Sequence, residues 1–327
     1  MATYILRRVL GMLPTLFIVS IITFVLIQLP PGDFLTSQLQ QLQQQGEQIS
    51  EDRIASLRRR YGLDQPMHVQ YVKWITNFVQ GDMGYSFEWN RPVNELIWDR
   101  VGYTVVIALA SVLFTWMVAF PIGIYSALRQ YSVGDSVFTA LGFLGLSTPS
   151  FLLAMVLMYL GYSWFGVSVG GLFSPELVAA PWSMAKFVDL LKHVWITTLV
   201  VGLAGTAGLI RVLRANLLDE LRKPYVTTAR AKGLGPIRLI LKYPVRIAIN
   251  PFVSTIGWML PHLFSGATIA AVVLSLPTTG PLLLRALMSQ DMYLAGSFIM
   301  ILSTLTVIGT LISDILLALL DPRIRYG

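Results

Sequence analysis

Few residues in this 327-residue chain have the type and spacing of a reactive site. The segment Gly166-Val167-Ser168-Val169-Gly170 matches the G-x-S-x-G pattern that presents a serine nucleophile. That pattern acts only between a strand and a helix, whereas here it follows a long apolar run in a glycine-rich stretch. We therefore do not favour an intramembrane serine hydrolase that uses Ser168, although it is kept as an alternative function. We predict no catalytic residue.

Metal and nucleotide chemistry are equally poorly supported by the sequence. The chain has no cysteine, and His68, His193 and His262 are far from one another and from any acidic cluster. Zinc sites need several Cys, His or carboxylate ligands, so we predict no metal site. The sequence also lacks G-x-x-x-x-G-K-[ST], the loop that holds nucleotide phosphates. Any ATP-driven process must therefore take its energy from a partner protein.

Asp314 is the ionisable residue that lies deepest inside an apolar segment. Charged groups within a membrane span are functional candidates, for example as proton relays. Asp314 lies within about two turns of the end of its segment, where its carboxylate can reach water or a basic loop. We therefore favour a structural pairing, with a proton-driven transporter that uses Asp314 as the alternative.

The composition indicates that most of the protein surface does not face water. Hydrophobic residues make up 55% of the chain and charged residues 13%, about half of the roughly 25% that soluble domains carry. The mean hydropathy is +0.66. The apolar residues gather in runs of about 20, the length that crosses a bilayer core of about 30 Å. These features exclude a soluble enzyme and predict a polytopic membrane protein.

Six charge-free runs predict six transmembrane helices in an all-α fold, because an isolated span must satisfy its own backbone hydrogen bonds. Residues 1–30 form an N-terminal anchor helix, whose apolar stretch is too long for a cleaved signal peptide. Residues 31–100 form an external soluble segment, and residues 101–327 form the transmembrane core. The five helices of the core are expected near 101–128, 136–165, 193–217, 247–275 and 292–320.

Prolines and glycines inside these runs predict kinks and close helix contacts. Proline removes a helical hydrogen bond and bends a span, and glycine lets neighbouring helices approach closely. The prolines are Pro121, Pro149 and Pro261, and the glycines are Gly142, Gly145, Gly202, Gly205 and Gly208.

The distribution of Lys and Arg predicts that both termini are cytoplasmic. In that orientation the inner segments hold 14 of the 24 basic residues, and the short outer loops hold three. The other seven lie in the segment 31–100, which is too long to influence topology. The net charge of +7 and the pI of 9.7 therefore reflect membrane topology, and we expect no nucleic-acid partner.

The external segment contains one amphipathic helix, predicted from Pro66 to Gln80. Proline favours the first helical turn, and Tyr71, Trp74, Ile75 and Phe78 share one face. We favour a cap that packs on the outer ends of the spans, with a docking surface for an external partner as the alternative.

The inner loop 211–246 contains the most informative segment. Pro224 suits the first helical position, and Gly233 suits the left-handed position that follows a helix C-terminus. The resulting helix of about nine residues is only about 13 Å long, so it lies along the membrane face without crossing it. A stiff helix held between two spans transmits motion to both. A plain surface helix with positive-inside charge is the alternative.

This segment resembles the cytoplasmic coupling motif of binding-protein-dependent ABC importer permeases, in the dipeptide/oligopeptide/nickel group. The motif is Thr227-Thr228-Ala229-Arg230-Ala231-Lys232-Gly233-Leu234, with Thr227 where the broad family has glutamate. Further matching motifs occur in the same order along nearly the whole chain, at residues 61–66, 81–86, 91–93, 146–151 and 321–326.

The resemblance implies a non-catalytic permease subunit in a prokaryotic cytoplasmic (inner) membrane. Such a subunit forms half of a pathway for peptides or similar small oligomers, with oligosaccharides or nickel as the alternative cargo. The implied partners are a second homologous permease, two cytoplasmic ABC ATPases, an external substrate-binding protein and membrane lipid. No cofactor is expected on this chain, because ATP and Mg bind the ATPases.

The resemblance also assigns site residues. The ATPase-coupling residues are Tyr225, Thr227, Thr228, Ala229, Arg230, Ala231, Lys232, Gly233 and Leu234, of which Arg230 and Lys232 are the polar contacts. The candidate external-loop contacts are Ser289, Gln290 and Asp291, close to the outer mouth of the pathway.

Overall fold

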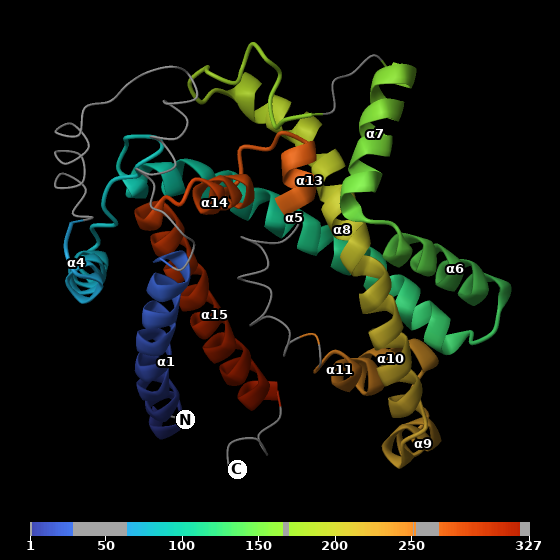
Figure 1. The fold of residues 1–327 in the computed structure, drawn as a ribbon. Helices are drawn as coiled ribbons and strands as arrows, with labels where there is room; N and C mark the ends of the chain where they lie inside the picture. The colour runs from blue at the N-terminus through green and yellow to red at the C-terminus, as the bar shows by residue number, and fades with distance from the viewer. Residues whose placement is uncertain (1, 29–63, 166–169, 251, 253–267, 321–327) are drawn as a thin grey trace. The chain divides into compact units, whose positions relative to one another are not determined.

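Helices make up all the regular structure that the computed structural model describes (Figure 1). The described residues are 2–28, 64–165, 170–250, 252 and 268–320. The chain divides into two compact units, Met1–Gly102 with Thr279–Leu311, and Tyr103–Thr278 with Ile312–Gly327. We call them unit 1 and unit 2. Helices α5 (Val93–Leu128) and α15 (Met292–Leu320) each contribute residues to both.

Unit 1 contains a contact between the N-terminal helix and the amphipathic helix that was predicted from Pro66 to Gln80. Besides parts of α5 and α15, its helices are α1 (Ala2–Gln28), α4 (Met67–Val79) and α14 (Thr279–Met288). Trp74 of α4 is 2% exposed and packs with Phe24 of α1 and Met292 of α15. The Tyr71 hydroxyl lies 2.8 Å from Ser20 Oγ. The predicted helix is confirmed, and its apolar face is covered within unit 1.

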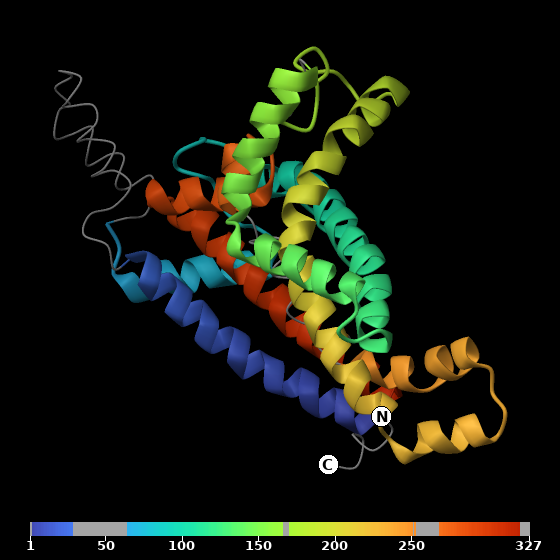
Figure 2. The same ribbon diagram turned by 90° about the vertical axis from the view of Figure 1, so that its right-hand side faces the viewer.

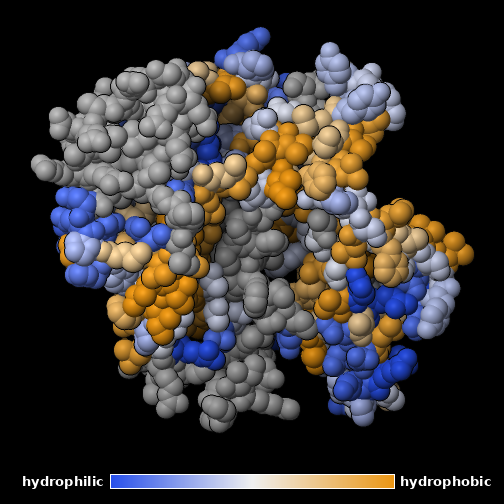
Figure 3. All heavy atoms as spheres, viewed as in Figure 1, coloured by the Kyte–Doolittle hydropathy of each residue, from blue (hydrophilic) through white to orange (hydrophobic). Residues whose placement is uncertain are grey.

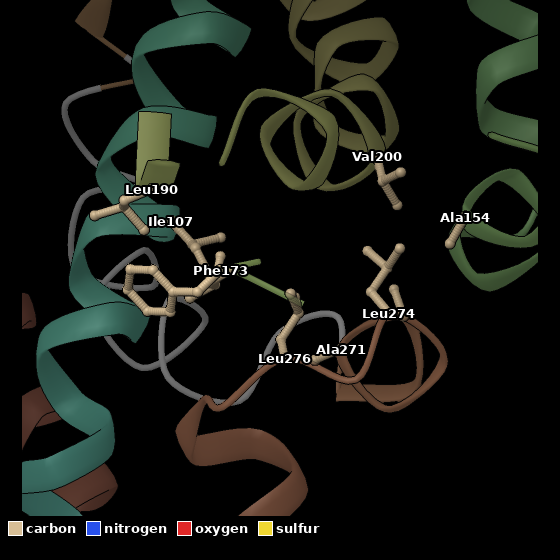
Figure 4. Close-up of a cluster of buried hydrophobic side chains, with 10 residues drawn as sticks. Ile107, Ala154, Phe173, Leu190, Val200, Ala271, Leu274 and Leu276 are labelled. Carbon is tan, nitrogen blue, oxygen red and sulfur yellow. The ribbon is translucent and has the colours of Figure 1, made fainter. Parts of the chain in front are cut away.

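Unit 2 contains the remaining helices. They are α6 (Val133–Ser147), α7 (Ser150–Phe165), α8 (Met184–Leu221), α9 (Pro224–Ala231), α10 (Pro236–Lys242), α11 (Pro244–Ala248) and α13 (Thr268–Val273). One cluster of buried side chains joins α5, α7, α8 and α13 around Leu274 and Val200, both 0% exposed (Figure 4). A second cluster packs α11 against α8 through Val245, Leu213 and Leu217.

Three single helices are long and apolar enough to cross a membrane: Arg8–Gln28, Val93–Leu128 and Met292–Ile315. Two bent pairs meet the same criteria, so the described residues contain up to five candidate spans. They correspond to five of the six predicted spans. The other prediction, at 247–275, falls largely on residues outside the described ranges.

The prediction of one helix through 136–165 is wrong. Two helices, α6 and α7, occupy this stretch and meet at an angle of 100°. Pro149 has no N–H and forces the preceding residue out of the helical region. Thr148 accordingly adopts φ −89° and ψ 117°. The sequence indicated a kink at this proline, and the structure has a full break.

Helix α8 begins at Met184, nine residues before the predicted start at 193. The charges in its first turns, which made them look like a loop, are satisfied internally. Lys186 donates to the carbonyl oxygens of Val178 and Ala180 at 3.1 and 2.6 Å. Asp189 accepts from the backbone N–H and the hydroxyl of Ser174, both at 2.7 Å. Because Lys186 and Asp189 are buried with hydrogen-bond partners, the helix extends beyond the charge-free run.

Glycine permits a close crossing of α5 and α8, as predicted. A Cβ on Gly202 would lie 2.6 Å from Phe114 Cδ1 and 3.2 Å from the Ser111 carbonyl oxygen. The Gly202 carbonyl accepts from the hydroxyls of Thr115 and Thr206 at 3.0 and 2.7 Å. Such hydroxyl bonds to a helical carbonyl favour bending, and α8 bends by 48° between Leu203 and Gly205.

The variant Gly202→Val is expected to lower the free energy of unfolding by about 1–3 kcal/mol, because the added atoms overpack this crossing. Gly208→Val is the matched control, since nothing lies within 4 Å of a Cβ at Gly208. Thermal unfolding of the purified protein in detergent measures the difference. Equal midpoints for the two variants would contradict the close crossing.

Candidate coupling site

The segment with the coupling motif forms the predicted short helix. Helix α9 begins at Pro224, which occupies its first turn, and ends at Ala231. Lys223 precedes it in an extended conformation, φ −73° and ψ 146°. Gly233 adopts φ +76°, the left-handed conformation that the sequence predicted. The Gly233 N–H donates to the Arg230 carbonyl at 3.0 Å and closes the helix end.

One face of α9 is attached to the rest of unit 2. Val226 and Ala229 are 1% and 5% exposed and pack against Leu239 of α10. The partly buried side chains around this contact are Tyr225, Leu234, Ile240 and Tyr243. Tyr225, Ala229 and Leu234, three of the nine residues predicted to couple, therefore contribute to the internal packing of the site.

The other six predicted residues are exposed: Thr227, Thr228, Arg230, Ala231, Lys232 and Gly233. Two cations, two hydroxyls and two small residues thus form one open polar face, which we call the α9 outer face. Hydrophilic residues gather over this end of unit 2 in the space-filling view (Figure 3). The Thr228 hydroxyl donates within the helix to the Pro224 carbonyl at 3.0 Å. The positive charge of the α9 outer face comes from Arg230 and Lys232.

A hydrogen bond that the sequence did not indicate ties α9 to the end of α8. The Tyr225 hydroxyl donates to Glu220 Oε2 at 2.5 Å. Burial raises the pKa of Tyr225, and the hydrogen bond and negative charge of Glu220 raise it further. The phenol therefore stays protonated at neutral pH and remains a donor.

The two chain connections of α9 are short. Only Arg222 and Lys223 separate it from α8. On the other side α10 contacts both α9 and α11, and α11 packs against α8. Figure 2 shows α9 and α10 as a hairpin of gold and orange helices that projects from the end of α8. Helix α10 ends at Lys242, and Pro244 begins the next helix, α11.

The external-loop candidates have a different environment in unit 1. Ser289 and Gln290 are partly exposed, whereas Asp291 is 0% exposed. Asp291 Oδ2 accepts from Ser86 Oγ at 2.5 Å and from the Glu88 N–H at 3.2 Å. Its Oδ1 accepts from the Leu294 N–H at 3.2 Å, which makes Asp291 the N-cap of α15.

Asp291 therefore joins the start of α15 to the loop before α5. Burial raises the pKa of its carboxyl group, and the hydrogen bonds from Ser86 and from the Leu294, Glu88 and Phe87 N–H groups partly oppose this shift. The sequence signal for the cap was an aspartate directly before a long apolar run.

The remaining sequence candidates do not form a reactive site in the described part of the chain. Ser168 and His262 lie outside the described residues. His193 Nδ1 lies 2.8 Å from the Asp189 carbonyl oxygen within α8. Among the described residues, no group of three His, Cys, Asp or Glu side chains could hold a metal ion.

Comparison with known proteins identifies the family of the chain. A sequence model described as "Binding-protein-dependent transport system inner membrane component" matches residues 119–326. A model of the N-terminal part of such membrane components matches residues 1–108. The chain belongs to this family.

Curated members of the family match over their whole length. The chain is 34% identical over 330 residues to the oligopeptide transport system permease protein AppB of Bacillus subtilis, with both chains fully covered. It is 32% identical over 326 residues to the glutathione transport system permease protein GsiC of Salmonella typhimurium, again with full coverage. It is 29% identical over 340 residues to the dipeptide transport system permease protein DppB of Alkalihalophilus pseudofirmus.

Family membership establishes the general role of the protein. It is a membrane-embedded permease subunit of an ABC importer, and it is not itself a catalyst, since a separate ATPase hydrolyses ATP. The family also works with a substrate-binding protein. Proton-driven transport through Asp314 and hydrolysis at Ser168 are not favoured.

Proposed function

We propose that this permease imports peptides or similar small oligomers and that α9 is the helix through which the ATPase drives it. The proposal is supported by the different environments of the two faces of α9. Val226 and Ala229 fix the helix to unit 2, while Arg230 and Lys232 remain exposed for a partner. A helix with one attached face and one open cationic face suits a docking role better than a purely structural one.

The proposed assembly has one second homologous permease, two cytoplasmic ATPases and one external binding protein. ATP and Mg bind the ATPases, and this chain binds no cofactor. Six spans, including one through 247–275, place both termini and α9 in the cytoplasm. Residues 31–100 lie outside, between the anchor helix 1–30 and the core 101–327. Short outer loops include Ser289 and Gln290, whose partial exposure suits contact with the binding protein.

The cargo proposal relies on the relatives. Their names refer to oligopeptides, glutathione and dipeptides. These names favour peptide-like cargo over oligosaccharides or nickel. Uptake of a set of short peptides by vesicles that contain the whole complex would test it, with an oligosaccharide and nickel as competing cargoes.

Single cysteines can test the coupling site and the topology together, because the natural chain has none. Arg230→Cys on the α9 outer face is expected to form a cross-link of short span to the ATPase in the assembled complex. Glu176→Cys, an exposed position before α8, is the matched control. It is expected to form no such cross-link and to react with a membrane-impermeant maleimide in intact cells.

Helix α8 has 38 residues, about 57 Å of helix, which is enough to separate these two positions by more than the thickness of a bilayer core. A cross-link from position 176, or external labelling of position 230, would contradict the proposed orientation. Absence of any cross-link from position 230 in an active complex would contradict the coupling site.

A further inference from the structure

An ion pair joins α6 to α8 in unit 2, between a buried carboxylate and a guanidinium that is partly exposed. Arg214 Nε lies 3.1 Å from Asp135 Oδ1, and Arg214 Nη2 lies 2.9 Å from Asp135 Oδ2. Asp135 is 3% exposed. Two parallel hydrogen bonds between a guanidinium and a carboxylate fix both distance and orientation. The pair is therefore a geometric link between the two helices.

The same carboxylate shapes the turn between α5 and α6. Asp135 Oδ2 also accepts from the Tyr131 N–H at 2.8 Å. Tyr131 adopts φ +62°, a left-handed conformation that is unfavourable for residues other than glycine. The Ser132 hydroxyl accepts from the Asp135 N–H at 3.2 Å and caps α6. Arg214, Asp135 and the strained turn thus form one connected polar network.

A second contact between α6 and α8 also lies beyond the bend of α8. A Cβ on Gly142 of α6 would lie 3.5 Å from the Ala207 Cβ of α8. Seven residues separate Asp135 from Gly142 and Ala207 from Arg214, so these two contacts are about two turns apart on antiparallel helices. Both α8 residues belong to the half Gly205–Leu221, which leads directly into α9.

Stability alone is a weak reason for such a pair. Burying the Asp135 carboxylate costs free energy that offsets much of its attraction to Arg214, whose side chain is 26% exposed. The bidentate geometry of the pair instead fixes one arrangement of the groups that it joins. Here those groups are the α5–α6 turn and the half of α8 that carries α9.

We propose that Asp135 and Arg214 are positioning residues for coupling. Their ion pair holds α6 and the α5–α6 turn against the half of α8 that leads into α9. A displacement of α9 then moves α6 as part of the same body, while α8 flexes at its bend beside Gly202. This inference rests on the proposed function, since it assumes that the ATPase acts on α9.

The test uses the whole complex in proteoliposomes and measures both import and ATP hydrolysis. Asp135→Asn removes the charge partner of Arg214 and is expected to reduce the substrate imported per ATP by about five-fold or more, the lower range of allosteric coupling. Asp219→Asn is the control, because it removes an exposed carboxylate from the last turn of α8. It is expected to keep the wild-type ratio.

A disulfide can replace the Asp135–Arg214 ion pair as the link between α6 and α8. The pair Gly142→Cys and Ala207→Cys brings two Cβ atoms to about 3.5 Å, within the range of disulfides, and no natural cysteine competes. Oxidation is expected to leave import by the otherwise wild-type protein unchanged, because α6 and this half of α8 do not separate. In the Asp135→Asn background, oxidation is expected to restore the import-to-ATP ratio, and reduction is expected to remove that effect.

Each alternative outcome overturns the inference. It is overturned if Asp135→Asn keeps the wild-type ratio of import to ATP hydrolysis. It is also overturned if Asp135→Asn loses import and ATP hydrolysis equally and oxidation does not repair the loss, or if the disulfide blocks import. If Asp135→Asn does not assemble, the disulfide in the otherwise wild-type protein decides. Failure of the proposed function is distinguishable, because Arg230→Cys would then not cross-link to the ATPase whatever Asp135 does.

Discussion

Replacing Gly233 with valine is expected to uncouple ATP hydrolysis from import while the permease still inserts into the membrane. Gly233 closes α9 at φ +76°, and nothing lies within 4 Å of a Cβ at that position. A clash of the added Cβ with neighbours therefore does not explain the effect. The left-handed conformation costs an ordinary residue about 1–2 kcal/mol, and a β-branched side chain tolerates it least.

That strain is relieved most easily by moving the end of α9. Arg230 lies in its last turn and Lys232 is its C-cap residue, so both would leave the geometry in which they face a partner. A change of about 1–2 kcal/mol corresponds to about a five- to thirty-fold change in an equilibrium. We therefore expect import per ATP to fall by about ten-fold, measured in proteoliposomes with the ATPase and binding protein present.

Asparagine at the same position separates conformation from side-chain size. Asn adopts the left-handed region far more readily than valine, so Gly233→Asn is expected to retain most coupled import. Equal losses in the two variants would show that the backbone conformation is not what matters. Normal import by Gly233→Val would remove α9 from the coupling mechanism.

The sequence predicted α9 well because its limits depend on local chemistry. Proline at the first turn and glycine after the last one act through their own backbone angles, whatever surrounds them. The Tyr225–Glu220 hydrogen bond was missed, because Tyr225 was assigned to contact with the ATPase and its partner lies in the preceding helix. The division of α9 into an attached and an open face also depends on α10, which no local pattern specifies.

Long-range polar contacts explain the other differences between expectation and structure. Asp291 looked like a surface residue of a polar loop, yet Ser86, 205 residues away, gives it a buried hydrogen bond. Asp135 and Arg214 are 79 residues apart, and no local pattern connects them. The start of α8 was misplaced for the same reason, since its charges find partners that a charge-free run cannot reveal.

Asp291→Ala is expected to destabilise unit 1 more than any exposed substitution nearby. The Ser86 hydroxyl and the N–H groups of Glu88 and Leu294 would each lose their acceptor. Each buried polar group left without a partner costs about 1–3 kcal/mol, and loss of an N-cap alone costs about 0.5–2 kcal/mol. We expect a loss of about 3 kcal/mol or more, measured as a lower midpoint of thermal unfolding in detergent.

The stability of Asp291→Asn should lie between that of Asp291→Ala and that of the wild type, because the amide oxygen accepts hydrogen bonds but the NH2 group cannot.

The contribution of Asp291 to stability depends on pH. The pKa of Asp291 is raised by folding, so its contribution to stability is greatest below the unfolded value of about 3.9. It decreases as the pH rises through the folded value. The difference in the free energy of unfolding between the wild type and Asp291→Asn should therefore decrease from about pH 4 upward.

Ser289→Ala is the control for this loop. Its hydroxyl makes a single 3.3 Å bond to the Ala286 carbonyl, and it accepts none of the buried donors that surround Asp291. The control is expected to unfold within about 0.5 kcal/mol of the wild type. If Asp291→Ala were equally stable but lost affinity for the external binding protein, Asp291 would act as an external contact and its role as the cap of α15 would be secondary.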